Sequence, residues 1–156
     1  MMLEIERRWL WHGPLPPHFF AELVQQGYIA YSETTSVRVR RSVTCGRRAR
    51  CELTVKVGSG LVRPEVNLPL TLEQFRELWR TVPIANRITK LRYHSRGRQE
   101  LVVDIFGKQL RGLCIAEVEF SSREAAEAFV PHNFGVEVTD DPRYSNFQLA
   151  LHGLPR

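Results

Sequence analysis

Charged residues alternate with apolar residues in two short stretches of the chain. Glu4, Glu6 and Arg8 are spaced by two residues, and so are Glu117 and Glu119. In a β-strand, side chains two residues apart lie on the same face, so the charges of each stretch would point in one direction. The pattern therefore predicts strands that carry charge on one face and mainly apolar side chains on the other.

Similar alternation elsewhere predicts a sheet-dominated domain. Arg38 precedes Arg40 by two residues, and Lys90 precedes Arg92, with valine or leucine between them. Eight strands are expected, over about residues 3–10, 28–32, 36–43, 50–57, 61–68, 87–94, 100–106 and 113–120. Eight strands suffice to close a barrel, whose charged interior would form a tunnel. The alternative is an antiparallel sheet with a solvated charged face, and the alternation alone leaves both interpretations open.

A helix is expected between the first two strands. A break rich in proline at residues 13–17 precedes it, and apolar residues including Phe20, Leu23 and Val24 form one side of a helix over about residues 18–26. The last segment, over residues 144–151, also has apolar residues at helical spacing. We expect it to pack across one mouth of the tunnel.

Two capping-box patterns predict two further flanking helices. Thr71 followed by Gln74 opens one of them, and Ser121 followed by Glu124 precedes the other, over about residues 125–129. All three flanking helices are expected to be scaffold, because their apolar stripes are most simply explained by packing on the sheet.

Length and composition favour one domain, spanning residues 1–156. A chain of 156 residues with 43% hydrophobic residues can bury one substantial core. No apolar run approaches the roughly 20 residues of a membrane helix, so we expect a soluble, cytoplasmic protein that does not associate with membranes. The three cysteines form no CxxC pair and are expected to be free thiols. The five histidines show no metal-binding or catalytic spacing.

The net charge of +5 indicates an anionic partner. Two arginine-rich segments lie at expected hairpin tips, with Arg47 and Arg48 in one and Arg96 and Arg98 in the other. They could bind nucleic acid, but solvated turns explain them more simply, so nucleic acid is the less favoured partner. The sequence is compatible with a homodimer but does not determine the oligomeric state.

The charges aimed at the inside of the sheet are of both signs. Burying either sign alone would cost many kcal/mol, whereas the two together can coexist with water and ions. Carboxylates bind Mg²⁺, and arginine and lysine bind phosphate oxygens, so one cavity with both is suited to polyphosphate. The basic residues are Arg8, Arg38, Arg40, Lys56, Arg63, Lys90 and Arg92, and the acidic residues are Glu4, Glu6, Glu65, Asp104, Glu117 and Glu119.

These residues also carry a family resemblance. The segment from Glu4 to Arg8 resembles the ExExK signature of the CYTH superfamily, the triphosphate tunnel metalloenzymes, with arginine in place of the final lysine. Further segments resemble successive family motifs in the right order, at residues 27–29, 37–40, 53–56, 63–65, 89–93, 103–106, 116–120 and 138–146. Each motif alone is weak, but their order along nearly the whole chain is a strong signal.

The resemblance implies an α+β fold, an eight-stranded antiparallel β-barrel tunnel that binds a triphosphate with Mg²⁺ or Mn²⁺. The small bacterial tripolyphosphatases are the most similar members, which implies hydrolysis of inorganic tripolyphosphate to pyrophosphate and phosphate. By position in the motifs, the metal would be held by Glu4, Glu6, Glu65, Asp104, Glu117 and Glu119. The phosphates would be bound by Arg8, Arg38, Arg40, Lys56, Arg63, Lys90 and Arg92.

Two residues differ from the family pattern in ways that would lower metal affinity or turnover. Asn67 stands where the family commonly has a second acid after Glu65, and an amide is a weaker metal ligand. Arg8 keeps the positive charge of the family lysine but cannot accept a proton. Among the catalytic candidates Lys90, Lys56 and Arg8, a lysine could act as general base if its pKa were lowered, and otherwise the metal alone must activate the water.

Other functions remain open at this point. The tunnel could bind polyphosphate or nucleotides without turning them over. It could also act on thiamine triphosphate or a nucleoside triphosphate, or convert ATP to cyclic AMP as a class IV adenylate cyclase does. The organic substrates need a surface that recognises a base, which no residue of the sequence clearly supplies.

Overall fold

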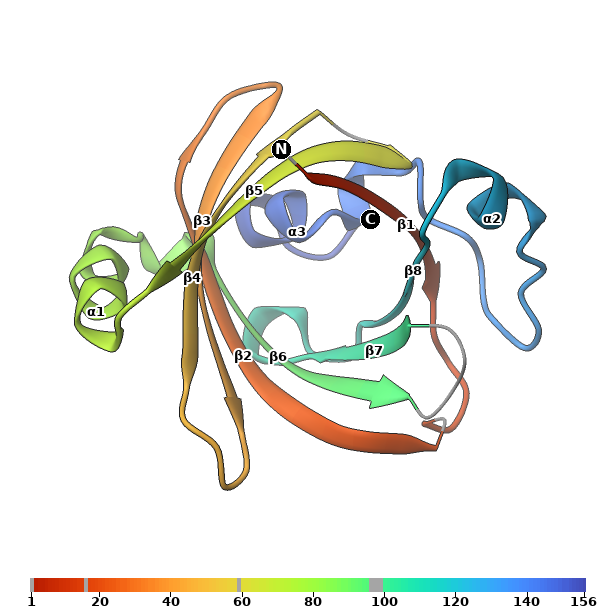
Figure 1. The fold of residues 1–156 in the computed structure, drawn as a ribbon, viewed down its shortest axis with the longest axis horizontal. Helices are drawn as coiled ribbons and strands as arrows, with labels where there is room; N and C mark the ends of the chain where they lie inside the picture. Colours follow the sequence, from red (N-terminus) through yellow and green to blue (C-terminus); the bar gives the residue numbers. More distant parts are fainter. Residues whose placement is uncertain (1, 16, 59, 96–99) are drawn as a thin grey trace.

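The computed structural model describes residues 2–15, 17–58, 60–95 and 100–156. Within these residues the chain forms eight strands, closed into an antiparallel barrel in the order β1-β5-β4-β3-β2-β6-β7-β8 (Figure 1). The expected α+β fold with an eight-stranded antiparallel barrel is confirmed. The strands are β1 (Met2–Leu10), β2 (His18–Tyr31), β3 (Thr35–Thr44), β4 (Arg50–Val57), β5 (Val62–Leu70), β6 (Arg87–Ser95), β7 (Glu100–Phe106) and β8 (Cys114–Glu119).

Short helices connect and flank these strands in the described part of the chain. The α-helices are α1 (Leu72–Thr81), α2 (Arg123–Ala128) and α3 (Asn146–His152), and the 3₁₀ helices are η1 (Ile84–Asn86), η2 (Lys108–Leu110) and η3 (Pro142–Tyr144). In Figure 1, α1 and α2 lie outside the barrel on opposite sides, whereas α3 is seen within the ring of strands.

Strand β1 closes the barrel because it pairs with two neighbours in succession. Its first half is antiparallel to β5, with Glu4 opposite Arg63, and its second half is antiparallel to β8, with Arg8 opposite Glu117. The period of two places Glu4, Glu6 and Arg8 on one face, and all three line the interior cavity. The alternative of a charged face turned to solvent is therefore wrong.

The segment expected to form the first helix is instead the N-terminal part of β2. Glu22, Val24, Gln26 and Tyr28 are 4%, 0%, 0% and 3% exposed, as alternate side chains of a strand facing the interior. Leu23 and Val24 fit helical spacing locally, but β2 pairs with β6 from His18 to Gly27 and with β3 from Glu22 to Tyr31. Pairing with two neighbours overrides the local pattern.

Helix α1 packs on the outer face of the barrel. The Thr71 side chain accepts a hydrogen bond from the backbone N–H of Gln74, and the Gln74 side chain accepts one from the N–H of Thr71, which confirms the capping box. Phe75 is buried against β3 and β4. Gly27 of β2 allows this close approach, because a Cβ there would lie 2.6 Å from a methyl carbon of Val82.

Helix α2 covers the opposite outer face, beside β1. Its N-cap is Ser122, whose Oγ accepts from the backbone N–H of Ala125, so the expected cap at Ser121 is wrong by one residue. The backbone of Phe120 still pairs with β1, which delays the start of the helix. Trp9 and Phe120 form part of the apolar cluster beneath α2.

Helix α3 closes one end of the barrel. Leu149 and Ala150 are buried in one cluster with Tyr28, Ile88 and Ile115, which belong to the same strand faces as the inward charges (Figure 1). We call this cluster the plug. The expected packing of the last segment across one mouth agrees with this arrangement.

Residues 134–145, which we call the strap, lead from α2 to α3 along β1. The backbone N–H of Gly135 donates to the carbonyl oxygen of Leu10 at 3.0 Å, and the N–H of Val138 donates to that of Arg8 at 2.8 Å. A Cβ on Gly135 would collide with the same Leu10 oxygen, so only glycine fits here without a shift of the backbone. The strap is therefore held as an additional partner of β1.

Several other expectations concern the surface. Arg47 and Arg48 lie exposed between β3 and β4, as expected for a hairpin tip, whereas Arg96 and Arg98 lie outside the described residues. The three cysteines are free thiols, as expected; Cys51 is buried and Cys45 is exposed. No helix in the described ranges is long and apolar enough to cross a membrane.

Candidate functional site

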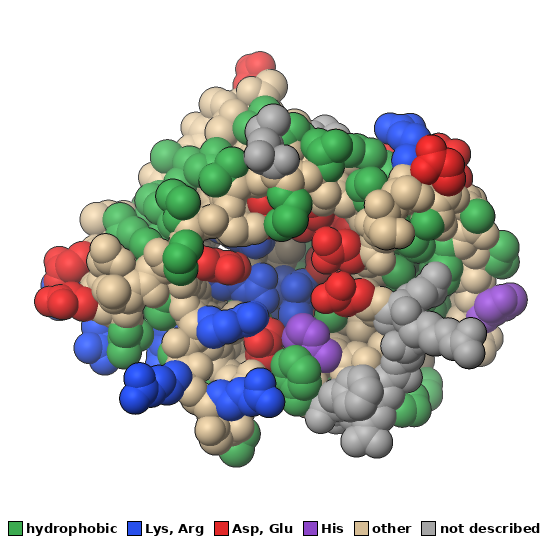
Figure 2. All heavy atoms as spheres, in the orientation of Figure 1, with side chains coloured by type: hydrophobic (Ala, Val, Ile, Leu, Met, Phe, Trp, Pro, Cys, Tyr) green, Lys and Arg blue, Asp and Glu red, His purple; other side chains and the backbone are tan. Residues whose placement is uncertain are grey.

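All eight strands contribute side chains to a cavity of about 560 Å³ inside the barrel. Figure 2 looks into its open mouth, with basic side chains deep inside and acidic side chains beside them. Two of the predicted site residues, Lys90 and Asp104, do not line it. The predicted residues that do are Glu4, Glu6, Arg8, Arg38, Arg40, Lys56, Arg63, Glu65, Arg92, Glu117 and Glu119.

Carboxylates gather on the neighbouring strands β5, β1 and β8. We call them the acid wall: Glu65, Glu4, Glu6, Glu117 and Glu119. The pKa of Glu119 is raised by its burial and by the nearby charges of Glu100, Glu4, Glu6 and Glu65. A negative potential therefore builds up along this wall, and a cation would relieve it.

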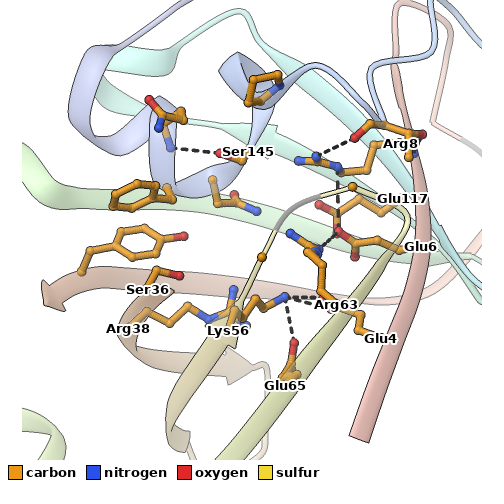
Figure 3. Close-up of a pocket in the computed structure, with 18 of the residues that line it drawn as sticks. Glu4, Glu6, Arg8, Ser36, Arg38, Lys56, Arg63, Glu65, Glu117 and Ser145 are labelled. Atoms are coloured by element: carbon orange, nitrogen blue, oxygen red, sulfur yellow. Dashed lines mark hydrogen bonds and ion pairs between the residues drawn. The ribbon is translucent and has the colours of Figure 1, made fainter. Parts of the chain in front are cut away.

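Two basic residues bridge the acid wall (Figure 3). Lys56 Nζ lies 2.9 and 2.7 Å from the two carboxylate oxygens of Glu4, and 2.9 Å from Oε2 of Glu65. Arg63 Nη2 lies 2.9 Å from Oε2 of Glu4 and also donates to Glu6. These contacts join β4, β5 and β1 across the cavity wall.

Asn67, the departure from the family acid, holds Glu65 in place. Its amide donates to Oε1 of Glu65, and its own oxygen accepts from the Thr54 hydroxyl at 2.7 Å. Burial alone would raise the pKa of Glu65, but Lys56, Asn67 and Arg38 outweigh it and lower the pKa to about 2. Glu65 is therefore a fixed carboxylate at neutral pH.

The opposite side of the cavity carries three arginines, of which Arg92 is closely paired with carboxylates, whereas Arg38 and Arg40 are not. We call Arg38 and Arg40 of β3, with Arg92 of β6, the basic wall. Among the described residues Arg38 forms no ion pair, although it is only 8% exposed. Arg40 lies 3.9 Å from both Glu22 and Glu52. Burial, together with Arg92 and Arg38, lowers the pKa of Arg40 to about 10, so this wall attracts anions.

Lys90 and Asp104 form a buried pair behind the cavity surface. Lys90 Nζ lies 2.6 Å from Oδ2 of Asp104 and 3.1 Å from Oδ1 of Asn146, which does line the cavity. Arg92 binds both oxygens of Asp104 at 2.7 and 2.8 Å and donates to Glu117. Asp104 is 0% exposed. Both of its oxygens are therefore engaged by cations, and Arg92 bridges it to the carboxylate of Glu117.

Burial acts in opposite directions on this pair. It lowers the pKa of Lys90 to about 8, opposed by Asp104 and reinforced by Arg92. Burial alone would raise the pKa of Asp104, but Arg92 and Lys90 hold it well below its usual range. Burial thus makes Lys90 easier to deprotonate than a lysine in water, although the amine stays mostly charged at neutral pH.

Arg8 directs its donors towards the strap. Its Nη1 donates to the carbonyl oxygen of Tyr144 at 2.9 Å, and its Nη2 to that of Thr139 at 3.3 Å. Its Nε lies 3.8 Å from Glu6. The arginine that replaces the family lysine therefore binds two backbone carbonyls at once.

The acid wall fits a hard divalent cation by its chemistry, since carboxylate oxygens are the ligands that Mg²⁺ and Mn²⁺ prefer. In the described part of the chain, however, no three Asp, Glu, His or Cys side chains are grouped closely enough to hold a metal as they stand. The carboxylates of Glu4, Glu6 and Glu65 instead surround the side chains of Lys56 and Arg63.

Sequence reasoning missed several residues of the site. His94 lines the cavity mouth, lies 3.0 Å from Glu22 and stacks on Phe20 with ring centroids 4.3 Å apart. Tyr28 and Asn146 also line the cavity. Glu22 falls in the segment that was expected to be a helix, whereas Tyr28 lies in an expected strand but carries no charge that would have marked it as a site residue.

The chain is similar to two curated inorganic triphosphatases. The protein of Nitrosomonas europaea is 35% identical over 154 residues, which cover 96% of this chain and 98% of the relative. The protein of Acetivibrio thermocellus is 35% identical over 130 residues, which cover 82% of this chain and 80% of the relative. No family model matches the chain.

Solved structures share the fold. A crystal structure of an inorganic triphosphatase superposes with a TM-score of 0.70 at 32% identity, covering 100% of this chain and 99% of the other. A Pyrococcus horikoshii protein reaches a TM-score of 0.61 at 17% identity, covering 80% and 83% of the two chains, which shows the fold alone. With a charged barrel interior and relatives this similar over nearly their whole length, the chain belongs to the inorganic triphosphatase family, within the CYTH superfamily of triphosphate tunnel metalloenzymes.

Proposed function

We propose that the chain hydrolyses a triphosphate in this cavity, and that inorganic tripolyphosphate, cut to pyrophosphate and phosphate, is its preferred substrate. One observation carries the proposal: the cations of the basic wall face the acid wall across one cavity, and Arg38 has no carboxylate partner among the described residues. An anion fits against the basic wall, and the relatives named inorganic triphosphatase supply the reaction.

The triphosphate tunnel family is in general metal-dependent, and we propose that the ion is Mg²⁺ or Mn²⁺. Such an ion neutralises phosphate charge and lowers the pKa of bound water. The acid wall would hold it. Asp104 would instead support Lys90 and Arg92, since its oxygens are already engaged.

The basic wall has a second role during the reaction. As a phosphoryl group transfers, negative charge develops on its oxygens and on the leaving pyrophosphate. Guanidinium groups that are already fixed and partly desolvated stabilise that charge without reorganising. Arg38, Arg40 and Arg92 meet this description, because each is mostly buried before any ligand arrives.

Among the three catalytic candidates, Lys90 is the best general base. A guanidinium is a poor proton acceptor, which argues against Arg8, and Nζ of Lys56 is already engaged by the carboxylates of Glu4 and Glu65. The lowered pKa of Lys90 places its neutral amine within reach of physiological pH. Because the amine lies behind Asn146, proton transfer requires a water molecule or a shift of that side chain.

Phosphate release from tripolyphosphate, ATP and thiamine triphosphate, each with Mg²⁺ or Mn²⁺, tests the proposal. We expect tripolyphosphate to give the highest kcat/KM, and Glu117→Gln, on the acid wall, to lower it. A cyclic AMP assay run beside it separates cyclisation from hydrolysis. Tight binding of triphosphate with no turnover of any substrate would identify a binding protein instead.

A further inference from the structure

The ammonium of Lys56 sits where a metal ion would be expected. Three carboxylate oxygens surround it, two from Glu4 and one from Glu65, at 2.7 to 2.9 Å. Mg²⁺ holds its oxygens at about 2.1 Å, so the same carboxylates would have to close in by less than about 1 Å. Figure 3 shows the Lys56 side chain reaching across the wall to these two residues.

Arg63 lies beside Lys56 on the acid wall and is likewise held between two carboxylates. It binds Glu4 and Glu6, so Glu4 is shared between the two cations. All four side chains are mostly shielded from water: their exposed fractions are 15% for Lys56, 11% for Arg63, 18% for Glu4 and 13% for Glu6. A divalent cation and these basic groups therefore cannot share the same oxygens without strong repulsion.

A triphosphate would resolve this conflict. It brings several negative charges into the cavity, so a lysine or arginine released from the acid wall would find a new partner there. The flexible stem of Lys56 allows such a change, since its ammonium can turn from the wall to the centre of the cavity. Metal binding and anion binding would then each favour the other by the same factor.

We propose that Lys56, assisted by Arg63, is a built-in counter-cation that fills the metal site of the ligand-free protein and moves to the triphosphate when metal binds. This rests on the proposed function, from which it takes the two ligands. It gives Lys56 a role beyond phosphate binding: it sets the affinity for metal and makes that affinity depend on the substrate. The ion should therefore bind weakly in the absence of triphosphate.

Mn²⁺ alone is the probe for the first experiment, with its dissociation constant measured by isothermal titration calorimetry. Lys56→Met keeps the length of the side chain and removes its charge. We expect it to bind Mn²⁺ about tenfold more tightly than the unmodified protein. Unchanged or weaker binding by this variant would overturn the proposal.

Arg38→Met is the matched control, because Arg38 lines the same cavity but has no carboxylate partner in the described residues. It removes one positive charge without opening the acid wall. We expect its affinity for Mn²⁺ to rise by less than about twofold, since Arg38 acts on the acid wall only through space and occupies none of its carboxylate oxygens. An equal gain in both variants would mean that net charge alone acts, and would also overturn the proposal.

A second measurement needs no variant. The chain has three lysines, Lys56, Lys90 and Lys108, so selective ¹³C labelling of lysine gives three side-chain signals. Mg²⁺ with a non-hydrolysable imido analogue of tripolyphosphate should shift the Lys56 signal, whereas Mg²⁺ alone at the same concentration should leave it in place. If Mg²⁺ alone shifts the Lys56 signal fully, the movement of Lys56 does not depend on triphosphate, and the proposed coupling between metal and anion binding is wrong.

Both readouts are binding measurements and are independent of turnover. If the protein hydrolyses no triphosphate but Lys56→Met gains affinity for Mn²⁺, the proposed function fails and the counter-cation stands. If it hydrolyses tripolyphosphate and Lys56→Met gains nothing, only the counter-cation fails.

Discussion

The guanidinium of Arg8 donates a hydrogen bond to the backbone carbonyl oxygen of Tyr144 at 2.9 Å. A second donor of the same group reaches the carbonyl oxygen of Thr139. Tyr144 ends η3, and the next residue, Ser145, caps α3 through the backbone N–H of Gln148. One arginine on β1 therefore fixes the segment that leads into the plug.

Replacing Arg8 with lysine should loosen the strap. An ammonium on the shorter side chain cannot reach both carbonyl oxygens at once, and losing one hydrogen bond of about 1 kcal/mol corresponds to about fivefold in a local opening equilibrium. Hydrogen–deuterium exchange of peptides from the strap should accelerate by that factor in Arg8→Lys. Peptides of α1 serve as the internal control. Unchanged exchange in the strap would show that Arg8 does not hold it.

Arg38→Met should weaken substrate binding more than it affects folding. The buried guanidinium has no carboxylate partner among the described residues and is available to phosphate, and a charge-assisted hydrogen bond contributes about 1.5–3 kcal/mol. We expect KM for tripolyphosphate to rise by about 10- to 100-fold. The exposed Arg111→Met provides a control with the same change of charge. Equal kinetics for the two variants would contradict the assignment of Arg38 to the substrate.

The rate of hydrolysis should depend on the protonation of Lys90. Its pKa of about 8 in the ligand-free protein means that the amine is charged below that pH and cannot accept a proton, so kcat/KM should fall as pH drops below about 8 and level off above it. Lys90→Arg keeps the charge but stays protonated, and should lose this inflection. The same inflection in the variant would rule Lys90 out and leave the metal-bound water as its origin.

Glu137 should stabilise the fold only above acidic pH. Arg7 donates to both of its oxygens, at 2.8 and 2.7 Å, and this lowers the pKa of the carboxyl. A carboxyl whose pKa is lower in the folded chain than in the unfolded chain contributes stability at neutral pH, and this contribution is lost as pH falls through the folded-state pKa. Glu137→Gln should therefore lower Tm at pH 7, by about 2–4 °C if the pair contributes about 1 kcal/mol.

The difference in Tm should narrow as pH falls below about 4. Glu127→Gln on the exposed face of α2 is the control and should change Tm little at any pH. A difference that stays constant from pH 7 to pH 3 would mean that the carboxylate charge is not what stabilises the strap.

Much of the barrel could be predicted from alternation alone. The expected limits of β4 and β7 agree with the structure, and the charges of β1 and β8 face inward as expected. Closure could not be derived in this way, because it depends on β1 lying between β5 and β8, and the spacing of residues within a strand does not specify its neighbours. The resemblance to the CYTH superfamily supplied that part.

The site was predicted as a set of charges but not as a set of partners. Asp104 alternates like the other acids, yet it lies opposite Arg92 on the neighbouring strand and is neutralised there. The partners of Arg8 come from the strap, more than a hundred residues further along the chain. Such pairings depend on which segments fold side by side, which the local pattern does not contain.

The alternation along β1 has a consequence for how this protein can change. Glu4 and Glu6 face the cavity, whereas Ile5 and Trp9 pack in the cluster beneath α2. Adjacent residues of one strand thus have separate surroundings, one lining the cavity and the next packed in the outer cluster. New specificities can be selected at every second position of the barrel while the outer clusters keep the fold intact.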